Sequence, residues 1–307
     1  MAAFTGTDLT YSIAGATGVG KFNREDLTDL ITNISPTERP FVAAVGRSTA
    51  KSTLHEWMHD TLRAATTNAR IEGDEFEYTQ SSSGTRLSNR TQILRETIVV
   101  SGTQDVVDKA GMSKWLTYQV AKKSKELGND LEWACLNQTQ AVTGNSTTAR
   151  VFMGVPGFVT SNVVNKTSGT VTVAVTQTDI NLASQNAWTD GGNPNLILCG
   201  AFNKRQISSF TTGVTKNLDA SDKRFVSHVD VYETDFGIFK VVPDHFIPAD
   251  DVWLLDPSLW SLAYLRPLQV KEPAITGDAS KRAMLMEVTL VCRAEEGNAG
   301  VINTTTA

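Results

Sequence analysis

A long polar stretch near the N-terminus has too few apolar side chains to build a core of its own. Apolar residues are sparse across 63–89, which is rich in Ser, Thr, Asn and Gly. Strand-like segments flank it, S-T-L-H-E-W-M-H-D-T-L at 52–62 and T-Q-I-L-R-E-T-I-V-V-S-G at 91–102. An isolated two-stranded ribbon is at best marginally stable in water. We therefore expect a long hairpin over 51–102 that rests on other protein surface.

The next segment, 113–140, has the periodicity of one long helix. Its apolar positions recur at helical spacing and no proline interrupts it. At 1.5 Å per residue a helix of this length would span ~42 Å, much more than the average globular helix. The apolar positions are Leu116, Val120, Leu127, Leu131 and Cys135.

The rest of the chain alternates short helices with strands. A helix is predicted from a cap at Thr178 or Asp179 through Trp188, and N-L-I-L-C-G at 195–200 predicts a buried strand. The segment 201–210 predicts a short helix, and strands dominate from there to the C-terminus. An additional short helix is expected at 25–34, with acidic residues in its first turn. These elements together place the chain in the α+β class.

Composition excludes several classes of protein. With 40% hydrophobic and 20% charged residues the chain is too apolar to be disordered, and no run of about 18 apolar residues could span a membrane. The N-terminus shows no secretory signal. The chain has three cysteines, Cys135, Cys199 and Cys292. Their odd number and wide spacing argue against a disulfide framework and fit a reducing compartment. A net charge of −5 argues against a dedicated nucleic-acid binder.

One motif could hold a metal. His55-Glu56-Trp57-Met58-His59 matches H-E-x-x-H, which on a helix chelates zinc through the two histidines, with the glutamate as base. The flanking residues show no helical apolar stripe, and on a strand the two histidines would lie ~13 Å apart, too far to share an ion. The other histidines, His228 and His245, do not complete a zinc signature. We therefore expect a strand, and keep a zinc metallopeptidase as the alternative.

A second motif resembles a nucleotide-binding loop. The segment 15–22 satisfies G-x-x-x-x-G-K, but Phe22 replaces the Ser or Thr whose hydroxyl binds magnesium. The strand that must precede such a loop is too short and polar, and the Walker B-like strand 252–256 is followed at once by Pro257. A flexible glycine-rich arm is the better interpretation.

The remaining charged clusters are interpreted as solvent-exposed surface. The basic run Lys122, Lys123 and Lys125 is followed by Glu126, Asp130 and Glu132, which is typical of a solvated helix face. The acidic pairs Asp250-Asp251 and Glu295-Glu296 lack ligand-type spacing. No catalytic, cofactor-binding or metal-ligating residue is assigned, and the chain is expected not to be an enzyme.

Five segments of the chain are informative in their wording and their order. They are L-I-T-N-I-S-P-T-E-R-P-F-V-A-A-V-G at 30–46, T-L-H-E-W at 53–57, Y-E-T-D-F-G-I-F-K-V-V-P-D at 232–244, L-L-D-P-S-L-W-S-L-A-Y-L-R-P at 254–267, and T-G-D-A-S-K-R-A-M-L-M-E-V-T-L at 276–290. No single segment is diagnostic, but together and in this order they resemble the major head proteins of tailed phages with the Hong Kong 97-type capsid fold. The similarity covers about residues 25–302.

The resemblance implies how the chain is divided. It implies an N-terminal arm, an extended E-loop hairpin, a peripheral domain with a long spine helix, an axial α/β domain, and return strands to the peripheral domain with a C-terminal tail. In this sequence these parts correspond to 1–50, 51–102, 103–149, 150–250 and 251–307. The arm, the hairpin and the threonine-rich tail at 304–306 are expected to be ordered by neighbouring subunits.

The resemblance also implies function and partners. A major capsid protein self-assembles into hexamers and pentamers of an icosahedral head that encloses double-stranded DNA. Expected partners are further copies of the chain, a portal protein, scaffolding and decoration or cement proteins, and packaged DNA through weak non-specific contacts, with no cofactor and no membrane. The expected location is the virion capsid, and the host cytoplasm during assembly. An encapsulin-like cellular shell protein of the same fold is the other alternative.

Overall fold

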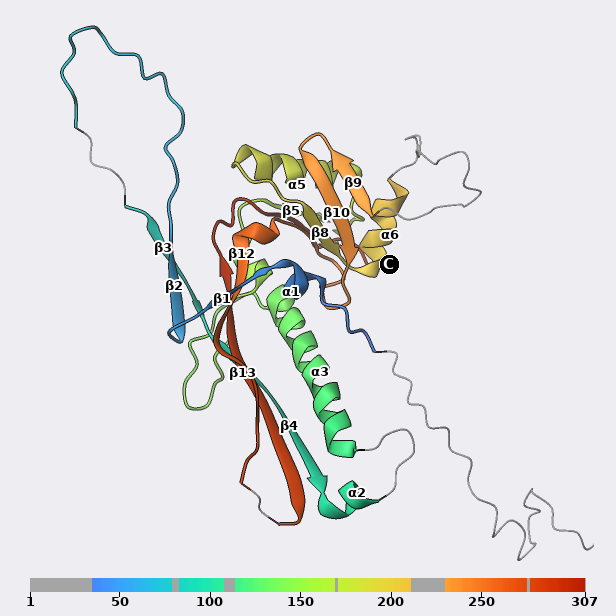
Figure 1. The fold of residues 1–307 in the computed structure, drawn as a ribbon. Helices are drawn as coiled ribbons and strands as arrows, with labels where there is room; N and C mark the ends of the chain where they lie inside the picture. Colours follow the sequence, from blue (N-terminus) through green and yellow to red (C-terminus); the bar gives the residue numbers. More distant parts are fainter. Residues whose placement is uncertain are drawn as a thin grey trace, which may run out of the picture.

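The computed structural model describes residues 35–78, 83–107, 114–168, 171–210, 230–274 and 277–306. The helix expected at 25–34, the nucleotide-loop match at 15–22 and His228 lie outside the described residues. The chain has an elongated limb, a second α/β unit beside one end of it, and a hairpin that projects from their junction (Figure 1).

The limb is a four-stranded sheet with one long helix lying along it (Figure 1). Antiparallel pairing runs along most of the two longest strands, so the sheet is narrow and extended. The strand order is β1 (Gly46–Thr49), β12 (Trp260–Lys271), β13 (Ala279–Cys292) and β4 (Gln92–Ser101). The helix is α3 (Trp115–Asn137), and the short α2 (Gly102–Val106) follows β4.

The long helix expected at 113–140 is confirmed as α3, which at 1.5 Å per residue extends about 35 Å. Its C-terminal half is largely buried, including Leu127, Leu131 and Cys135. Its N-terminal part keeps one face on the sheet, while Lys122 and Lys125 remain exposed. The helix therefore joins the limb to the rest of the subunit at one end only.

The second unit is built on a mixed six-stranded sheet. Its order is β5 (Val163–Asn165), β14 (Ala299–Ile302), β11 (Val252–Leu255), β8 (Leu196–Cys199), β10 (Gly237–Pro243) and β9 (Val231–Thr234). Helices α5 (Gln177–Thr189) and α6 (Ala201–Ser209) contribute Ile180 and Ile207 to the core on one face. The strand at 195–200 and the helix at 201–210 were both predicted from sequence, and both are confirmed.

Strands β8 and β11 are buried on both faces, which explains their continuous apolar sequences. Successive side chains of a strand point to opposite faces. On β11, Val252 and Leu254 pack with α5 and α6, whereas Trp253 and Leu255 pack with the C-terminal part of α3. The segment 251–307 therefore supplies strands to both sheets, since β12 and β13 belong to the limb.

The hairpin differs from expectation in its second strand. Strand β2 (Leu54–His59) pairs with β3 (Thr85–Arg90), inside the stretch that we read as turns. The segment 91–102, predicted to be the partner of β2, forms β4 and pairs with β13. The apolar residues of β4, such as Ile98 and Val100, are buried in the limb, and this burial outweighs pairing with the polar ribbon.

The remaining elements are short. They are α1 (Pro40–Ala44), α4 (Val155–Phe158), β6 (Thr167–Ser168), β7 (Val171–Thr172) and the 3₁₀ turn η1 (Pro257–Leu259). Helix α5 is capped by Thr176, two residues before the predicted cap: its hydroxyl accepts the amide of Asp179, which bonds back to the Thr176 amide.

The expectation for the C-terminal tail was wrong at Thr304. This residue is 1% exposed, and its hydroxyl donates to the Asp250 carbonyl at 2.9 Å. The same hydroxyl accepts a bond from the Asn203 amide at 3.0 Å. Thr304 is therefore ordered by the α/β unit of its own chain, where its hydroxyl and the Asn203 amide satisfy each other as buried polar groups.

Candidate assembly surfaces

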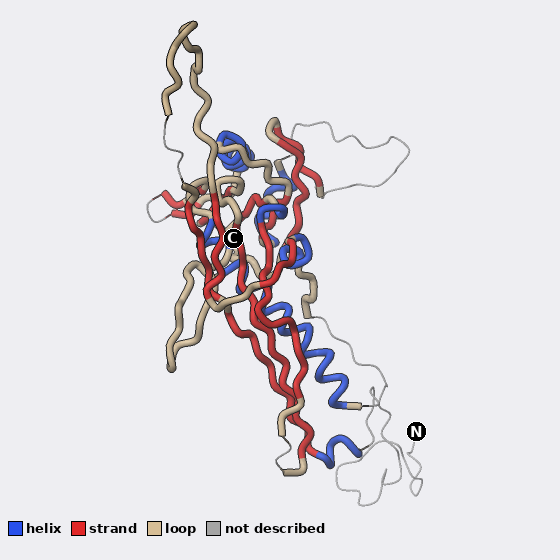
Figure 2. The backbone as a smooth tube through the Cα atoms, turned by 60° about the vertical axis from the view of Figure 1, so that its left-hand side comes forward, coloured by secondary structure: helices blue, strands red, loops and turns tan. Residues whose placement is uncertain are grey.

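The loop between β2 and β3 exposes large apolar side chains without any core beneath them. Figure 2 shows the loop projecting far beyond the rest of the chain. The most exposed of these side chains are Leu62 at 98%, Ile71 at 83%, Phe76 at 88% and Tyr78 at 93%. Apolar side chains gathered on a projecting element are typical of a protein contact surface.

The far end of this loop is also acidic. The segment 71–78, I-E-G-D-E-F-E-Y, carries four carboxylates and no basic residue. It contains a turn in which the Asp74 amide donates to the Ile71 carbonyl at 3.2 Å, with Gly73 at φ +87°. That φ is easily adopted only by glycine, which explains the residue at this position.

The base of the hairpin, in contrast, is fixed to the subunit. The indole N–H of Trp57 donates to the Cys292 carbonyl at 2.7 Å. The Asn89 side chain is buried, donates to the carbonyls of Leu290 and Met153, and accepts the Met153 amide at 2.8 Å. These bonds fix the direction in which the loop leaves the body while the loop itself stays unsupported.

The H-E-x-x-H segment lies on strand β2, as expected from its flanks. His55 packs against the Trp57 ring, with the centroids 5.9 Å apart. His59 Nδ1 lies 2.9 Å from the Arg293 carbonyl oxygen, and its Nε2 lies 3.8 Å from Glu296. A strand places the two histidines ~13 Å apart, so this segment cannot chelate one zinc ion.

No group of three or more His, Cys, Asp or Glu side chains is arranged to hold a metal within the described ranges. His245, the other described histidine outside the motif, belongs to no such group. The three cysteines are free and buried, and burial raises the pKa of each thiol. Thiols of this kind are unreactive because the thiolate is disfavoured.

Glu132 contradicts the interpretation of its cluster as a solvated helix face. It is fully buried on α3, and its two oxygens accept the backbone amides of Phe41 at 2.7 Å and Val42 at 2.8 Å. These amides belong to the first turn of α1 and have no partner within that helix. Glu132 therefore attaches the N-terminal segment to α3, 90 residues further along the chain.

Burial raises the pKa of Glu132 to about 8, and the neighbouring Asp244 carboxylate adds to the rise. The two amides oppose it by stabilising the charged form. Sequence reasoning missed this residue because it stands in a run of charges. The one local hint of its burial is that it lies between Leu131 and Ala134, two apolar residues that are both buried.

The other charged residues have structural partners. Lys122 and Lys125 are exposed, as expected of a solvated helix face, whereas Lys123 is partly buried and lies 3.2 Å from Glu96 and 2.6 Å from Glu126. Of the acidic pairs interpreted as plain surface, Glu295 accepts the Thr160 amide at 3.0 Å. Burial raises the pKa of Asp251 to about 6, so this side chain is not simply solvated either.

The Walker B-like strand is the buried β11, and Asp256 at its end accepts the Ser258 amide at 2.9 Å, capping η1. This aspartate stabilises a turn. A nucleotide site also needs a strand before the glycine-rich loop and a Ser or Thr hydroxyl in it. Those parts of the motif belong to the match at 15–22, which lies outside the described residues.

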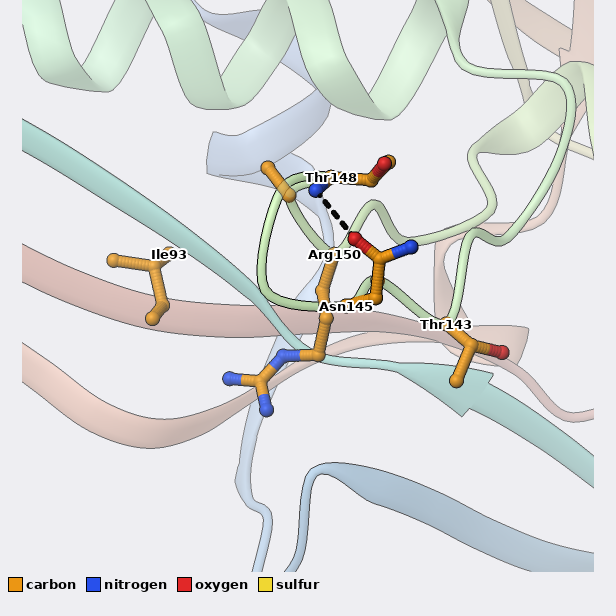
Figure 3. Close-up of a pocket in the computed structure, with 7 residues that line it drawn as sticks. Ile93, Thr143, Asn145, Thr148 and Arg150 are labelled. Atoms are coloured by element: carbon orange, nitrogen blue, oxygen red, sulfur yellow. Dashed lines mark hydrogen bonds between the residues drawn. The ribbon is translucent and has the colours of Figure 1, made fainter.

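A surface pocket of about 410 Å³ lies between the loop 143–150 and Ile93 of β4 (Figure 3). The amide of Thr148 donates to Asn145 Oδ1 at 2.7 Å, which holds the loop in its turn. The one charged lining residue, Arg150, is paired with Glu287. Its other lining residues are uncharged.

Within the described part of the chain, no helix is long and apolar enough to cross a membrane. The features that remain are contact surfaces: an extended limb, an unsupported loop and a fixed hairpin base.

Comparison with known proteins agrees with these features. The SU10 major capsid protein family matches residues 7–306. The major capsid protein of Escherichia phage Phieco32 is 26% identical over 310 residues, covering 85% of this chain and 88% of that protein.

Solved structures show the same fold at low sequence identity. The capsid asymmetric unit of cyanophage A-1(L) has a TM-score of 0.70 at 11% identity, covering 92% of this chain and 97% of that one. The capsid structure of cyanophage P-SCSP1u has a TM-score of 0.64 at 10% identity and full coverage of both chains. The holo-SrpI encapsulin complex from Synechococcus elongatus has a TM-score of 0.60 at 10% identity, covering 93% of each chain.

The resemblance inferred from sequence is thus confirmed, and so is the Hong Kong 97-type fold. The chain belongs to the SU10 major capsid protein family and is the major capsid protein of a phage.

Proposed function

We propose that copies of this chain form hexamers and pentamers of an icosahedral head around double-stranded DNA. The loop 60–84 carries this proposal, because its exposed apolar side chains have no core in the subunit. In a closed lattice a neighbouring copy supplies the missing surface. Such heterologous contacts close into rings when the rotation between copies is suitable.

In this proposal the parts of the chain have the roles of a shell subunit. Residues 1–50 act as the N-terminal arm, the projecting hairpin as the E-loop, the limb with α3 as the peripheral domain, and the six-stranded unit as the axial domain. Portal, scaffolding and cement proteins are the expected heterologous partners. Assembly takes place in the host cytoplasm, and the chain acts without catalysis.

A net charge of −5 supports only weak contact with the packaged genome. Each phosphate neutralised by Lys or Arg adds salt-dependent affinity, which would slow the release of DNA. An acidic subunit avoids that cost while the lattice encloses the DNA.

Removal of the loop tests the proposal. Replacing residues 61–83 with Asn-Gly keeps β2 and β3, whose register joins His59 to Thr85. A larger deletion of 64–88 would remove most of β3, so a failure to assemble could not be told apart from misfolding. We expect a folded monomer by circular dichroism and no shells by electron microscopy; normal shells from this variant would refute the proposal.

The encapsulin-like alternative has one observation in its favour, the similarity of fold to the SrpI complex. The contents of purified particles discriminate between the two functions. Double-stranded DNA protected from nuclease supports the phage head, and a protein cargo without DNA supports the cellular shell.

A further inference from the structure

His59 stands at the point where the projecting hairpin leaves the body of the subunit. It is the last residue of β2, and it forms the outermost pair of the β2–β3 ladder with Thr85. Its side chain lies on the same face as that of Trp57, because alternate residues of a strand share a face. Trp57 bonds to the Cys292 carbonyl, and His59 Nδ1 lies 2.9 Å from the next carbonyl along, that of Arg293. Within the described part of the loop, 60–78 is exposed throughout, so the ring is the last attachment before it.

The carbonyl determines which ring nitrogen of neutral His59 carries the hydrogen. A carbonyl oxygen can only accept, so Nδ1 donates to Arg293 and Nε2 is left with a lone pair. The Nε2 atom is shielded from solvent and has no hydrogen-bond partner among the described residues. It faces the Glu296 carboxylate at 3.8 Å, and an ionised carboxylate cannot donate a hydrogen either. In the neutral state two acceptors therefore face one another.

The charged groups around the ring favour a positive charge on it. The segment after β13 supplies Glu295 and Glu296, while the Arg293 side chain there is exposed to solvent. On β2 itself the next residue is Asp60, and the residue opposite on β3 is an uncharged threonine. The Cys292 thiol stays protonated, since burial raises its pKa. Among the ion pairs of the described residues, Glu296 takes part only in the one with this ring.

The backbone that presents Glu296 is itself fixed. The Glu296 carbonyl accepts the side-chain amide of Asn162 at 2.8 Å, and Asn162 is buried. The amide of Asn298 closes the same turn by donating to the Glu295 carbonyl at 3.0 Å. Rotation of the glutamate side chain alone is therefore enough to bring its oxygen to about 2.8 Å from Nε2, the length of a charge-assisted hydrogen bond.

We propose that His59 and Glu296 form a pH-dependent switch that attaches the base of the projecting hairpin more firmly in acid than at alkaline pH. In acid a proton from solvent binds Nε2, and the imidazolium then donates through both nitrogens, to the Arg293 carbonyl and to the Glu296 carboxylate. Because the charged form gains this partner only in the folded hairpin, the added stability is present in acid and is lost as the pH rises. The switch belongs to a single subunit and does not depend on the proposed function.

A double-mutant cycle in the full chain tests the switch. It compares wild type, His59→Gln, Glu296→Gln and the combined variant by urea unfolding at about pH 5.5 and about pH 8.5, on either side of the usual histidine titration. We expect the coupling of the two residues to change the unfolding equilibrium constant about two- to five-fold in acid, and not measurably at the higher pH. Glu132 and Asp251 also titrate in this range, but they are common to all four proteins and cancel. Equal coupling at both pH values, or none in acid, overturns the proposal.

Glu56 provides a matched control on the same hairpin. Its carboxylate lies 3.8 Å from Arg86, the same separation as in the His59–Glu296 pair, but the arginine does not titrate. A second cycle with His59→Gln and Glu56→Gln is expected to show no coupling that changes with pH. A pH-dependent coupling as large as that of Glu296 would reveal a general effect of charge and refute the switch.

Hydrogen exchange gives a local readout at the same two pH values. After correction for intrinsic exchange, the amides of 57–60 and 85–88 in the wild type are expected to be about two- to five-fold better protected in acid. Glu296→Gln is expected to remove that difference. This variant changes one terminal group of a partly exposed side chain and keeps the backbone bonds, so the measurement stands even if His59→Gln fails to fold. An acid-dependent gain that persists in Glu296→Gln counts against the pairing.

Discussion

Arg150 and Glu287 form an ion pair of 2.6 Å that joins the loop after α3 to the centre of the limb sheet. Glu287 is 3% exposed on β13 and is also bonded by Arg266 at 2.8 Å and by the Thr91 hydroxyl at 2.8 Å. One buried carboxylate therefore ties together β12, β13, the start of β4 and the loop 143–150.

We expect Glu287→Ala to destabilise the subunit by about 1.5–3 kcal/mol, because it removes the carboxylate shared by Arg150, Arg266 and Thr91 while both guanidinium groups stay partly solvated. Arg150→Ala should cost only about 1 kcal/mol, since Arg266 and Thr91 still satisfy Glu287 and the Arg150 side chain is partly solvated. Urea unfolding measures both. Equal losses for the two variants would show that the carboxylate does not organise this cluster.

Removal of the Glu132 side chain should free the N-terminal segment from α3. Glu132→Ala leaves the amides of Phe41 and Val42 unpaired, at about 1–3 kcal/mol for each buried group. Glu126→Ala on the same helix is the matched control: it removes a partly exposed ion pair, worth about 0–1 kcal/mol. Hydrogen exchange at Phe41 and Val42 reports the anchor directly, and unchanged protection in Glu132→Ala would contradict it.

The raised pKa of Glu132 also predicts a pH dependence. Its folded-state value, about 8, lies above the ordinary value of 4.5, so the folded chain binds this proton more tightly. The stability from this proton is complete below pH 4.5 and is lost as pH rises through 8. Asp251 acts with the same sign at lower pH, through a pKa of about 6.

Comparison of wild type with Glu132→Gln isolates the effect, because glutamine has no proton to lose and Asp251 is common to both. The free energy of unfolding of the wild type is expected to fall more steeply between pH 5 and 8. Parallel curves for the two proteins over that range would rule out Glu132 as the source.

Chelators are expected to leave the subunit unchanged, because the two histidines of the H-E-x-x-H segment lie apart on β2. His59→Ala should lower stability by about 1 kcal/mol through loss of its bond to the Arg293 carbonyl, with or without EDTA. Thermal unfolding measures both effects. A lower melting temperature of the wild type in EDTA would revive the zinc alternative.

Subunits of the assembled shell are expected to be joined without covalent bonds through the loop. No lysine occurs between Lys51 and Lys109, so the hairpin has no amine for an isopeptide link. Particles boiled in detergent and reductant should run at 33.3 kDa. A ladder that survives reduction would contradict this prediction.

Segments with strong local patterns could be predicted from the sequence. Helix α3 follows from an uninterrupted apolar stripe, and β8 from four consecutive apolar residues between turn formers. The unsupported loop could be predicted from the scarcity of apolar residues across 63–89. In each case the information lies within the segment itself, because the chemistry of a helix face or a buried strand repeats over a short window.

Features that depend on distant partners could not be predicted. Strand β3 is polar, and Asn89 within it is buried with its side chain bonded to the Leu290 carbonyl, 201 residues away in sequence. The sequence around Glu132 is typical of a solvent-exposed residue, because the two α1 amides that donate to it are distant in the chain. Burial of a single polar residue leaves no periodic signal, since it depends on a partner that only the folded chain supplies.

The apolar core shared by β8, β11 and the C-terminal part of α3 has a consequence for how one sequence can occupy unequal positions in a closed shell. A hinge between limb and α/β unit would have to open packed side chains such as Trp253 and Leu136, which behave as one block. In the proposed head, differences in curvature between five-fold and six-fold rings would have to be absorbed outside that block. Residues 60–78 are exposed throughout, and we expect the torsion angles to vary there from one position to the next.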